Sequence, residues 1–243
     1  YDCAAVVANG ELWGVVPKQH ITPMESRWFA SGMNCDESTV VELAGQSTCL
    51  GCEQLFEIDG VRFGVEIGED MNALITPSSV AVENGAKIIF NLSASDEVTG
   101  KHEYLRSLIA QQSARCMAGY VYSSCGYGES TTDLVFAGNA LIAENGTMIA
   151  QGQRFSLDVQ LVCTEIDLDK LRMERRGNTT FATAQADLFP KAIRTRGNGQ
   201  CHNFLRFDRG KVQGAEPVDG AVCIGERLEV SNVFRSFSHL CNN

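Results

Sequence analysis

Two short apolar runs in this sequence are each followed by side chains that could do chemistry. Lys18 comes just after the run Leu12–Val16, where an ammonium could stand over a cleft or could equally be a solvated surface group. Glu69 follows the run Val61–Ile67 at a point where a sharp turn would suit a nucleophile, yet position 68 is a glycine. The alternative there is an acidic turn after a core strand.

A third apolar run, Lys87–Leu92, is followed by hydroxyl groups. Ser93 and Ser95 come directly after it, and Lys101 lies a few residues further on. These groups could bind a polar ligand, or the hydroxyls could simply cap the next helix. Because chemistry in parallel sheets gathers at the carboxyl ends of the strands, the three places together indicate one edge of a sheet.

The elements that must position these residues alternate between strands and helices. Asn9–Gly10, Asp59–Gly60 and Asn145–Gly146 are hairpin-turn signals. Helical spacing and terminal signals predict two helices, over Ser78–Asn84 and His102–Met117. Apolar runs predict strands at Cys3–Ala8, Leu12–Val16, Leu55–Ile58, Val61–Ile67, Lys87–Leu92, Tyr120–Ser123, Leu134–Phe136, Ala140–Ala143, Met148–Ala150 and Leu157–Ile166.

This order favours an α/β fold in which the middle strands are parallel and the hairpins add antiparallel pairs at the edge. Residues 19–54 have no sustained period, so we expect a long loop there. Beyond Arg172 the pattern weakens while Gly, Arg and Asn accumulate, and we expect an extended arm.

Charge and hydropathy argue against some classes of partner. The chain has 243 residues with 30 acids against 20 bases, a net charge of −10. Such a surface repels phosphate backbones, so nucleic acid is not an expected partner. No run approaches the roughly 18 apolar residues of a membrane span, so a membrane is not expected either.

Ten cysteines leave two interpretations open, reduced thiols or a secreted disulfide framework. Several lie inside apolar runs, and a chain of this length can bury a core without disulfides, so we favour reduced thiols in a cytoplasmic protein. The one Cys-x-x-Cys pair is Cys49 and Cys52. It lacks a second ligand pair at a spacing that zinc would need, and we expect no metal site.

Five runs of the sequence resemble one known family. They are GVVPK (14–18), FEIDGVRFGVEIGED (56–70), NLSAS (91–95), SARCMAGYVYSSCGYGESTTDLVF (113–136) and ALIAENG (140–146). They resemble the glutaminase domain of bacterial glutamine-dependent NAD⁺ synthetases, which is a member of the nitrilase (carbon–nitrogen hydrolase) superfamily. The resemblance covers most of residues 1–180, and GYGESTTDLVF is specific beyond the superfamily.

The resemblance implies a nitrilase-like αββα sandwich and a Glu–Lys–Cys triad. The cysteine thiolate would attack the side-chain amide of glutamine, the lysine would stabilise the oxyanion, and the glutamate would move the proton. The ammonia would pass to a separate synthetase domain, which amidates deamido-NAD. ATP and Mg²⁺ are expected only in that domain, and no cofactor is expected here.

The catalytic residues that the resemblance implies can be placed one by one. The family lysine falls on Lys18, and the supporting glutamate of the superfamily falls on Glu25. The family pattern has the nucleophilic cysteine where this chain has Gly68, and two pocket aromatics are replaced by Met24 and Asn72. A glycine cannot attack a carbonyl, so the resemblance implies that catalysis is impaired.

Substrate-binding positions also carry over from the family. Glu69 matches a contact for the substrate ammonium, Ser95 matches the glutamine-binding serine, and Lys101 matches the nearby basic residue.

The resemblance also implies an incomplete assembly. The triad glutamate of the family lies upstream of the first strand seen here, so we expect the N-terminal strands and helices of the sandwich to be missing. We expect residues 1–172 to be a partial glutaminase domain and residues 173–243 to be an extension, an interface or a linker to a synthetase domain. A homo-oligomer is expected. The alternative function is a catalytically dead structural or assembly module.

Overall fold

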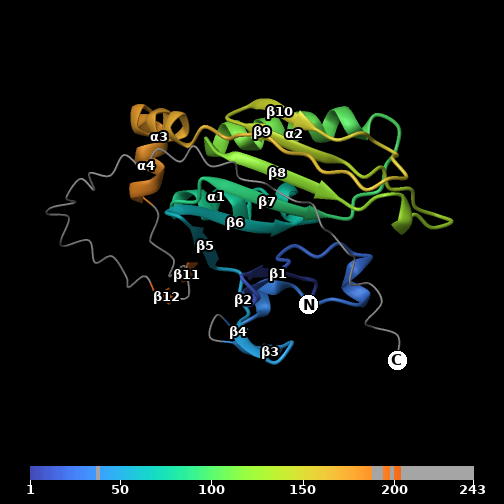
Figure 1. Ribbon diagram of the computed structural model, residues 1–243, viewed down its shortest axis with the longest axis horizontal. Helices are drawn as coiled ribbons and strands as arrows, with labels where there is room; N and C mark the ends of the chain where they lie inside the picture. The colour runs from blue at the N-terminus through green and yellow to red at the C-terminus, as the bar shows by residue number, and fades with distance from the viewer. Residues whose placement is uncertain (37–38, 188–193, 198–199, 204–243) are drawn as a thin grey trace, which may run out of the picture.

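The computed structural model describes residues 1–36, 39–187, 194–197 and 200–203. They form a mixed α/β fold around one sheet, whose strands run in the order β10-β9-β8-β7-β6-β5-β11-β12 (Figure 1). Strands β6, β7 and β8 are parallel to one another, while β5, β9 and β10 add antiparallel pairs. The strands are β5 (Gln54–Ile58), β6 (Val61–Ile67), β7 (Ile88–Ser93), β8 (Gly119–Ser124), β9 (Ala140–Glu144), β10 (Thr147–Gln151), β11 (Arg194–Gly197) and β12 (Gln200–Asn203).

A separate hairpin, β1 (Cys3–Ala8) with β2 (Glu11–Pro17), packs against the main sheet. Its turn residues Asn9 and Gly10 have φ of 53° and 78°, the left-handed pair that the Asn–Gly signal predicts. Trp13 and Val16 of β2 are buried in one cluster with Phe56 of β5. The hairpin therefore rests on the sheet and brings the end of β2 beside the end of β6.

Two helices cover one face of the sheet, α1 (Pro77–Glu83) and α2 (Lys101–Cys116). The sequence favours a helix start at Pro77, because Thr76 accepts a hydrogen bond from the amide of Ser79 and proline is preorganised for the first turn. Ile109 of α2 is fully buried against the sheet. Both helices match their predicted ranges to within a residue.

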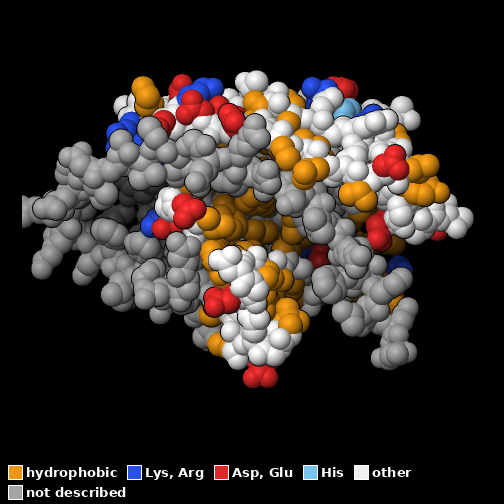
Figure 2. Space-filling view, viewed as in Figure 1, with side chains coloured by type: hydrophobic (Ala, Val, Ile, Leu, Met, Phe, Trp, Pro, Cys, Tyr) orange, Lys and Arg blue, Asp and Glu red, His pale blue; other side chains and the backbone are white. Residues whose placement is uncertain are grey.

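The opposite face of the sheet is rich in aromatic side chains. Phe63 lies between Phe56 and Phe90, with ring centroids 5.5 Å and 5.3 Å away. Figure 2 shows apolar side chains gathered across the middle of this view, between the main sheet and the hairpin of β3 (Val40–Leu43) with β4 (Gln46–Cys49) below it. The α/β class predicted from the sequence is confirmed: helices on one face, a sheet, and a β-hairpin against the other face.

The long loop predicted for residues 19–54 is only partly right. It contains two short turns of 3₁₀ helix, η1 (Glu25–Arg27) and η2 (Gly32–Asn34), and a hairpin of β3 (Val40–Leu43) with β4 (Gln46–Cys49). The strands were missed because they are four residues long and largely polar, so they carry almost no hydrophobic period.

Two predicted strands are wrong. Leu134–Phe136 lies in an irregular loop, where the side chains of Leu134 and Val135 are about half exposed. Leu157–Ile166 is also irregular, although it is rich in β-branched residues. There the side chain of Gln160, rather than a ladder of main-chain groups, bonds both the amide and the carbonyl of Gln153. A run of apolar residues does not form a strand without a partner strand beside it.

The extended arm predicted beyond Arg172 is wrong for its first part. Helix α3 (Leu168–Gly177) runs across the boundary placed after residue 172, and α4 (Thr179–Asp187) follows. Leu171 is the one residue of α3 that is buried, so the apolar stripe is too narrow for its period to stand out in the sequence. Residues 188–193, 198–199 and 204–243 lie outside the described residues, and the role given to 173–243 stays a prediction.

We expect Arg175 to hold α3 against the rest of the fold. Its guanidinium donates to the carbonyls of Met117, Ala86 and Cys116 at 3.0, 2.8 and 3.2 Å, and it lies over the ring of Phe181. Replacing Arg175 with alanine should lower the free energy of unfolding by about 2 kcal/mol, because three carbonyls lose their donor. Urea unfolding followed by circular dichroism measures this.

The neighbouring Arg176 is the matched control, because its side chain is exposed on the same helix. Arg176→Ala should change the free energy of unfolding by less than about 0.5 kcal/mol. Equal effects of the two variants would contradict the docking role of Arg175.

Candidate active site

Lys18 stands at the end of β2 with its side chain buried. Its amide donates to the carbonyl of Asp2 across the hairpin at 2.8 Å, and its own carbonyl accepts from Gly32 at 2.7 Å. Only 4 % of Lys18 is exposed. An ammonium group that is so buried needs a partner, and here the partner is the carboxylate of Glu25 in η1.

Glu25 is held in place from two sides. One carboxylate oxygen contacts the Lys18 ammonium, and the other accepts the amide of Thr22 at 2.9 Å. Burial raises the pKa of Glu25, but the hydrogen bonds from Lys18 and Thr22 outweigh burial and hold the pKa below its usual value. Glu25 is therefore a fixed anion beside the lysine.

Gly68 lies at the turn between β6 and the 3₁₀ helix η3 (Gly68–Asn72). Its φ of +49° is in the left-handed region, so the chain bends sharply there and presents position 68 at the tip. A Cβ built at this position would lie 3.5 Å from Nζ of Lys18 and 3.8 Å from Oγ of Ser93. The structure thus brings Lys18, Glu25 and position 68 together.

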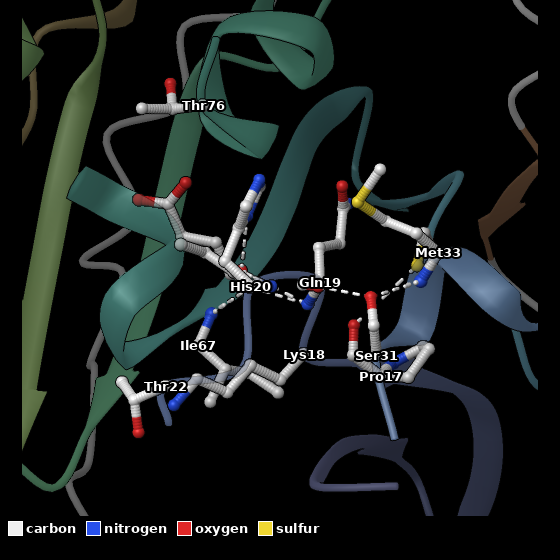
Figure 3. A network of polar contacts seen from close by, with 12 residues as sticks. Pro17, Lys18, Gln19, His20, Thr22, Ser31, Met33, Ile67 and Thr76 are labelled. Atoms are coloured by element: carbon white, nitrogen blue, oxygen red, sulfur yellow. Dashed lines mark hydrogen bonds and ion pairs between the residues drawn. The ribbon is translucent and has the colours of Figure 1, made fainter. Parts of the chain in front are cut away.

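Asp70 ties this turn to the lysine. Its carboxylate is almost fully buried and accepts the amides of Gln19, His20 and Ile67 at 2.7–3.3 Å. It also contacts Nδ1 of His20 at 3.0 Å. Figure 3 shows the segment from Lys18 to His20 beside Ile67. The amides of Gln19, His20 and Ile67 share the Asp70 carboxylate as their acceptor. One carboxylate therefore fixes the end of β2 relative to the end of β6.

A buried network supports the turn from beneath. Glu66, two residues before Gly68, is 1 % exposed and accepts from Tyr120, from Asn91 at 3.3 Å and from the amide of Ser78 at 2.9 Å. Burial raises the pKa of Glu66, although these hydrogen bonds oppose the rise. Because Ser78 lies in the first turn of α1, the network joins β6, β7, β8 and α1 at one point under the site.

Ser95 lies near the site through shared contacts rather than in direct contact with Lys18. Its amide donates to Oγ of Ser124 at 3.3 Å. Burial raises the pKa of the Tyr122 phenol, and the nearby hydroxyls of Ser93, Ser124 and Ser95 oppose that rise. The four hydroxyls form a polar cluster at the carboxyl ends of β7 and β8.

Lys101 and Glu69 are placed less centrally. Lys101, the first residue of α2, pairs with Asp96 at 2.6 Å, and among the described residues it forms no hydrogen bond or ion pair with those around Lys18. Glu69 is exposed in the first turn of η3. The structure therefore puts both residues at the same edge of the sheet, but it does not bring them against Lys18.

Several residues of the site were missed in the sequence. Asp2 stands opposite Lys18 across the β1–β2 hairpin, and its neighbour Cys3 pairs with Pro17. The Asn9–Gly10 turn alone would place Tyr1 opposite Lys18, but a β-bulge between Val6 and Val7 shifts the register by one residue, and no signal in the sequence marks this bulge. Nothing marks Glu66 or Asp70 either, since their partners come from segments distant in the chain.

The described part of the chain was searched for metal sites, disulfides and membrane-spanning helices. No group of three or more His, Cys, Asp or Glu side chains there could hold a metal ion. The seven cysteines within residues 1–187 have free thiols, at positions 3, 35, 49, 52, 116, 125 and 163. Among the same residues, no helix is both long and apolar enough to span a bilayer.

Sequence comparison finds relatives that share one name. The chain is 37% identical over 188 residues to a glutamine-dependent NAD(+) synthetase of Mycobacterium tuberculosis, which covers 74% of this chain and 27% of the relative. It is 36% identical over 191 residues to that of Saccharomyces cerevisiae, covering 72% and 26%. The chain thus spans about a quarter of the length of the curated relatives it matches. No protein-family model matches it.

Comparison with solved structures finds similarity to the same kind of protein. A glutamine-dependent NAD(+) synthetase from Cytophaga hutchinsonii superimposes with a TM-score of 0.54 and 26% identity, covering 64% of this chain and 25% of that one. Nit3 of Saccharomyces cerevisiae, a member of branch 10 of the nitrilase superfamily, gives 0.51 at 17% identity over 70% and 54%, which supports the fold alone. The fold is that of nitrilase-superfamily proteins, and by sequence this chain belongs to the family of glutamine-dependent NAD(+) synthetases, of which it matches one part.

Proposed function

We propose that the site around Lys18 is a glutaminase site, which hydrolyses glutamine to supply ammonia for the ATP-dependent amidation of deamido-NAD. The single observation that carries this proposal is the 3.5 Å between Nζ of Lys18 and a Cβ built at position 68. A nucleophile at that tip would attack the amide carbon with the ammonium close enough to stabilise the oxyanion. The names of the relatives support glutamine as the substrate.

Each side chain has a role in this proposal. Lys18 stabilises the developing oxyanion, Glu25 is the counter-ion that pairs with the lysine, and Gly68 marks the place of the nucleophile. Glu69, Ser95 and Lys101 hold the amino-acid end of the substrate glutamine. Because these three residues lie at the sheet edge and Lys18 is buried, the amide of glutamine points inward and its amino-acid end points outward.

The steps that use the ammonia take place in another domain or subunit of the assembly. A synthetase domain or subunit takes up the ammonia, and ATP with Mg²⁺ is used there. We propose a cytoplasmic protein that assembles as a homo-oligomer. The reaction itself is impaired in this chain, since Gly68 has no side chain with which to form an acyl intermediate.

Restoring the nucleophile tests the proposal. Gly68→Cys should raise the rate of glutamate release from glutamine by about 10³-fold or more over the unchanged protein, because the reaction regains a covalent route. Gly68→Ala is the matched control. It meets the same ordinary contacts and the same left-handed backbone strain, but has no thiol. Turnover by the Gly68 or Gly68→Ala protein as fast as by Gly68→Cys would contradict the mechanism.

A second function is favoured by Gly68 itself. Without a nucleophile, the domain would serve assembly and dock a synthetase partner that uses ammonia from solution. Mixing the chain with a homologous ammonia-dependent synthetase at micromolar concentration and measuring the mass of the complex tests this. A complex together with no glutaminase activity in Gly68→Cys favours the assembly module, while activity in that variant favours the glutaminase.

A further inference from the structure

Ser95 and Lys101 lie at the two ends of one short connection, which leads from β7 to α2. Packing does little to hold this connection in place. Its residues 98–100 are exposed, and a cavity of about 420 Å³ lies between it and the side chains of Arg154 and Phe155. A segment with few buried apolar contacts opens easily. Polar contacts must therefore set the positions of Ser95 and Lys101.

Glu97 lies in the middle of this connection and makes such contacts. Its side chain is only 7 % exposed. One carboxylate oxygen pairs with the guanidinium of Arg154 at 2.9 Å, and the other accepts the side-chain amide of Asn139 at 2.9 Å. The main-chain amide of Glu97 donates to the carbonyl of Val135 at 2.7 Å. A buried carboxylate with a charged or amide donor on each oxygen is held in one place, because leaving either oxygen without a partner is costly.

The side chain of Asn139 extends the contacts of Glu97 to the start of α2. Asn139 is 4 % exposed and lies directly before β9. Its side-chain nitrogen donates to Glu97, so its side-chain oxygen is the acceptor for Nδ1 of His102 at 3.0 Å. His102 is the residue after Lys101. A continuous path of hydrogen bonds therefore runs from the Glu97 carboxylate to the first turn of α2, where Lys101 lies.

The main chain of Asn139 is linked to the other end of the connection. Its carbonyl accepts the amide of Ser124 at 2.9 Å, and Oγ of Ser124 accepts the amide of Ser95 at 3.3 Å. Asn139 is thus tied to both ends of the connection, while Glu97 is tied to its middle. A change at Glu97 should therefore move Ser95 and Lys101 together.

We propose that Glu97 is a positioning residue for the substrate, which through Arg154 and Asn139 fixes Ser95 and Lys101 where they bind the amino-acid end of glutamine. This inference rests on the proposed glutaminase function. The carboxylate of Glu97 binds Arg154 and Asn139 rather than Lys18, so its loss weakens the binding of glutamine without changing the chemistry at the amide. Such a loss raises KM and leaves kcat nearly unchanged.

Glu97→Gln in the Gly68→Cys protein tests the proposal. Glutamine keeps the shape of the side chain, but it has no charge for Arg154 and only one oxygen for the two donors. We expect KM for glutamine to rise about tenfold, while kcat stays within threefold of the parent. Glu103→Gln is the matched control, because Glu103 lines the same cavity but is exposed in the first turn of α2. It should change KM by less than twofold.

Two further measurements separate positioning from a general loss of structure. Alkylation of the introduced thiol by iodoacetamide, followed by peptide mass spectrometry, reports on position 68 alone, and its rate should stay within threefold in Glu97→Gln. In a Lys101→Met background, Glu97→Gln should raise KM by about threefold or less, because the two changes remove the same interaction. A KM within threefold of the parent, equal losses of alkylation and glutamine hydrolysis, or fully additive effects with Lys101→Met overturn the role of Glu97.

Titration calorimetry with glutamine keeps this inference separate from the proposed function. In the chain with Gly68 unchanged, Glu97→Gln should raise the Kd for glutamine about tenfold. If Gly68→Cys releases no glutamate, the proposed hydrolysis fails, and the effect of Glu97→Gln on this Kd alone decides the positioning role. If the unchanged chain binds no glutamine, both the proposed function and the role of Glu97 fail.

Discussion

Replacing Lys18 with methionine in the Gly68→Cys protein is expected to lower kcat for glutamine by about 10²- to 10³-fold. Methionine has a similar length and keeps most of the packing, but it has no charge to place beside the oxyanion. The side chain is buried, so its ammonium acts with little screening by water, which is where such a charge has its largest effect. Steady-state kinetics of glutamate release measure the change.

Lys101→Met is the comparison that makes the Lys18 result specific. Lys101 lies at the start of α2, pairs with Asp96 and is partly exposed. If it binds the amino-acid end of glutamine, its loss should raise KM by about tenfold and leave kcat within threefold, because it removes binding that is equal in the ground and transition states. A Lys18 variant that raised only KM would show that the ammonium binds substrate without stabilising the transition state.

Local patterns predicted the parts of this fold that are set by neighbours in the chain. The hairpin turns at Asn9–Gly10, Asp59–Gly60 and Asn145–Gly146 are all present with left-handed backbone at both turn residues. The helix start at Pro77 and the long helix α2 also follow from short-range signals. Leu157–Ile166 shows the limit, because whether an apolar run becomes a strand depends on a partner that may be distant in the sequence.

The same division applies to the site. The sequence marks Lys18 and Gly68 as strand-end residues, and the family resemblance adds Glu25, Glu69, Ser95 and Lys101. It does not show that Asp70 bonds the Gln19 and His20 amides, some 50 residues away along the chain, and so sets the distance between Lys18 and position 68. Carboxylates that organise a site through main-chain amides carry no spacing signal, because the amides belong to residues of any type.

The buried carboxyl of Glu66 gives the largest expected effect on stability. Glu66→Ala should lower the free energy of unfolding by about 4 kcal/mol, because it opens a cavity and leaves the Tyr120 hydroxyl, the Asn91 amide and the Ser78 N–H without their acceptor. The loss is a large share of the 5–15 kcal/mol that typical domains possess. Urea unfolding at pH 7 measures it. Tyr120→Phe, which removes one donor and little volume, should cost only about 1–2 kcal/mol.

Measuring the free energy of unfolding as a function of pH separates the effect of the Glu66 charge from the effect of its packing. Burial raises the pKa of Glu66 in the folded state above the value of 4.5 that it has when exposed, so folding favours the protonated form. The stability that this gives is present below pH 4.5 and is lost as the pH rises through the folded-state pKa. Glu66→Gln cannot ionise, and the gap in unfolding free energy between the parent and this variant should therefore narrow as the pH increases. A constant gap would mean that the three donors balance the burial of Glu66, and a gap that widens would mean that they outweigh it; either result would contradict a raised pKa.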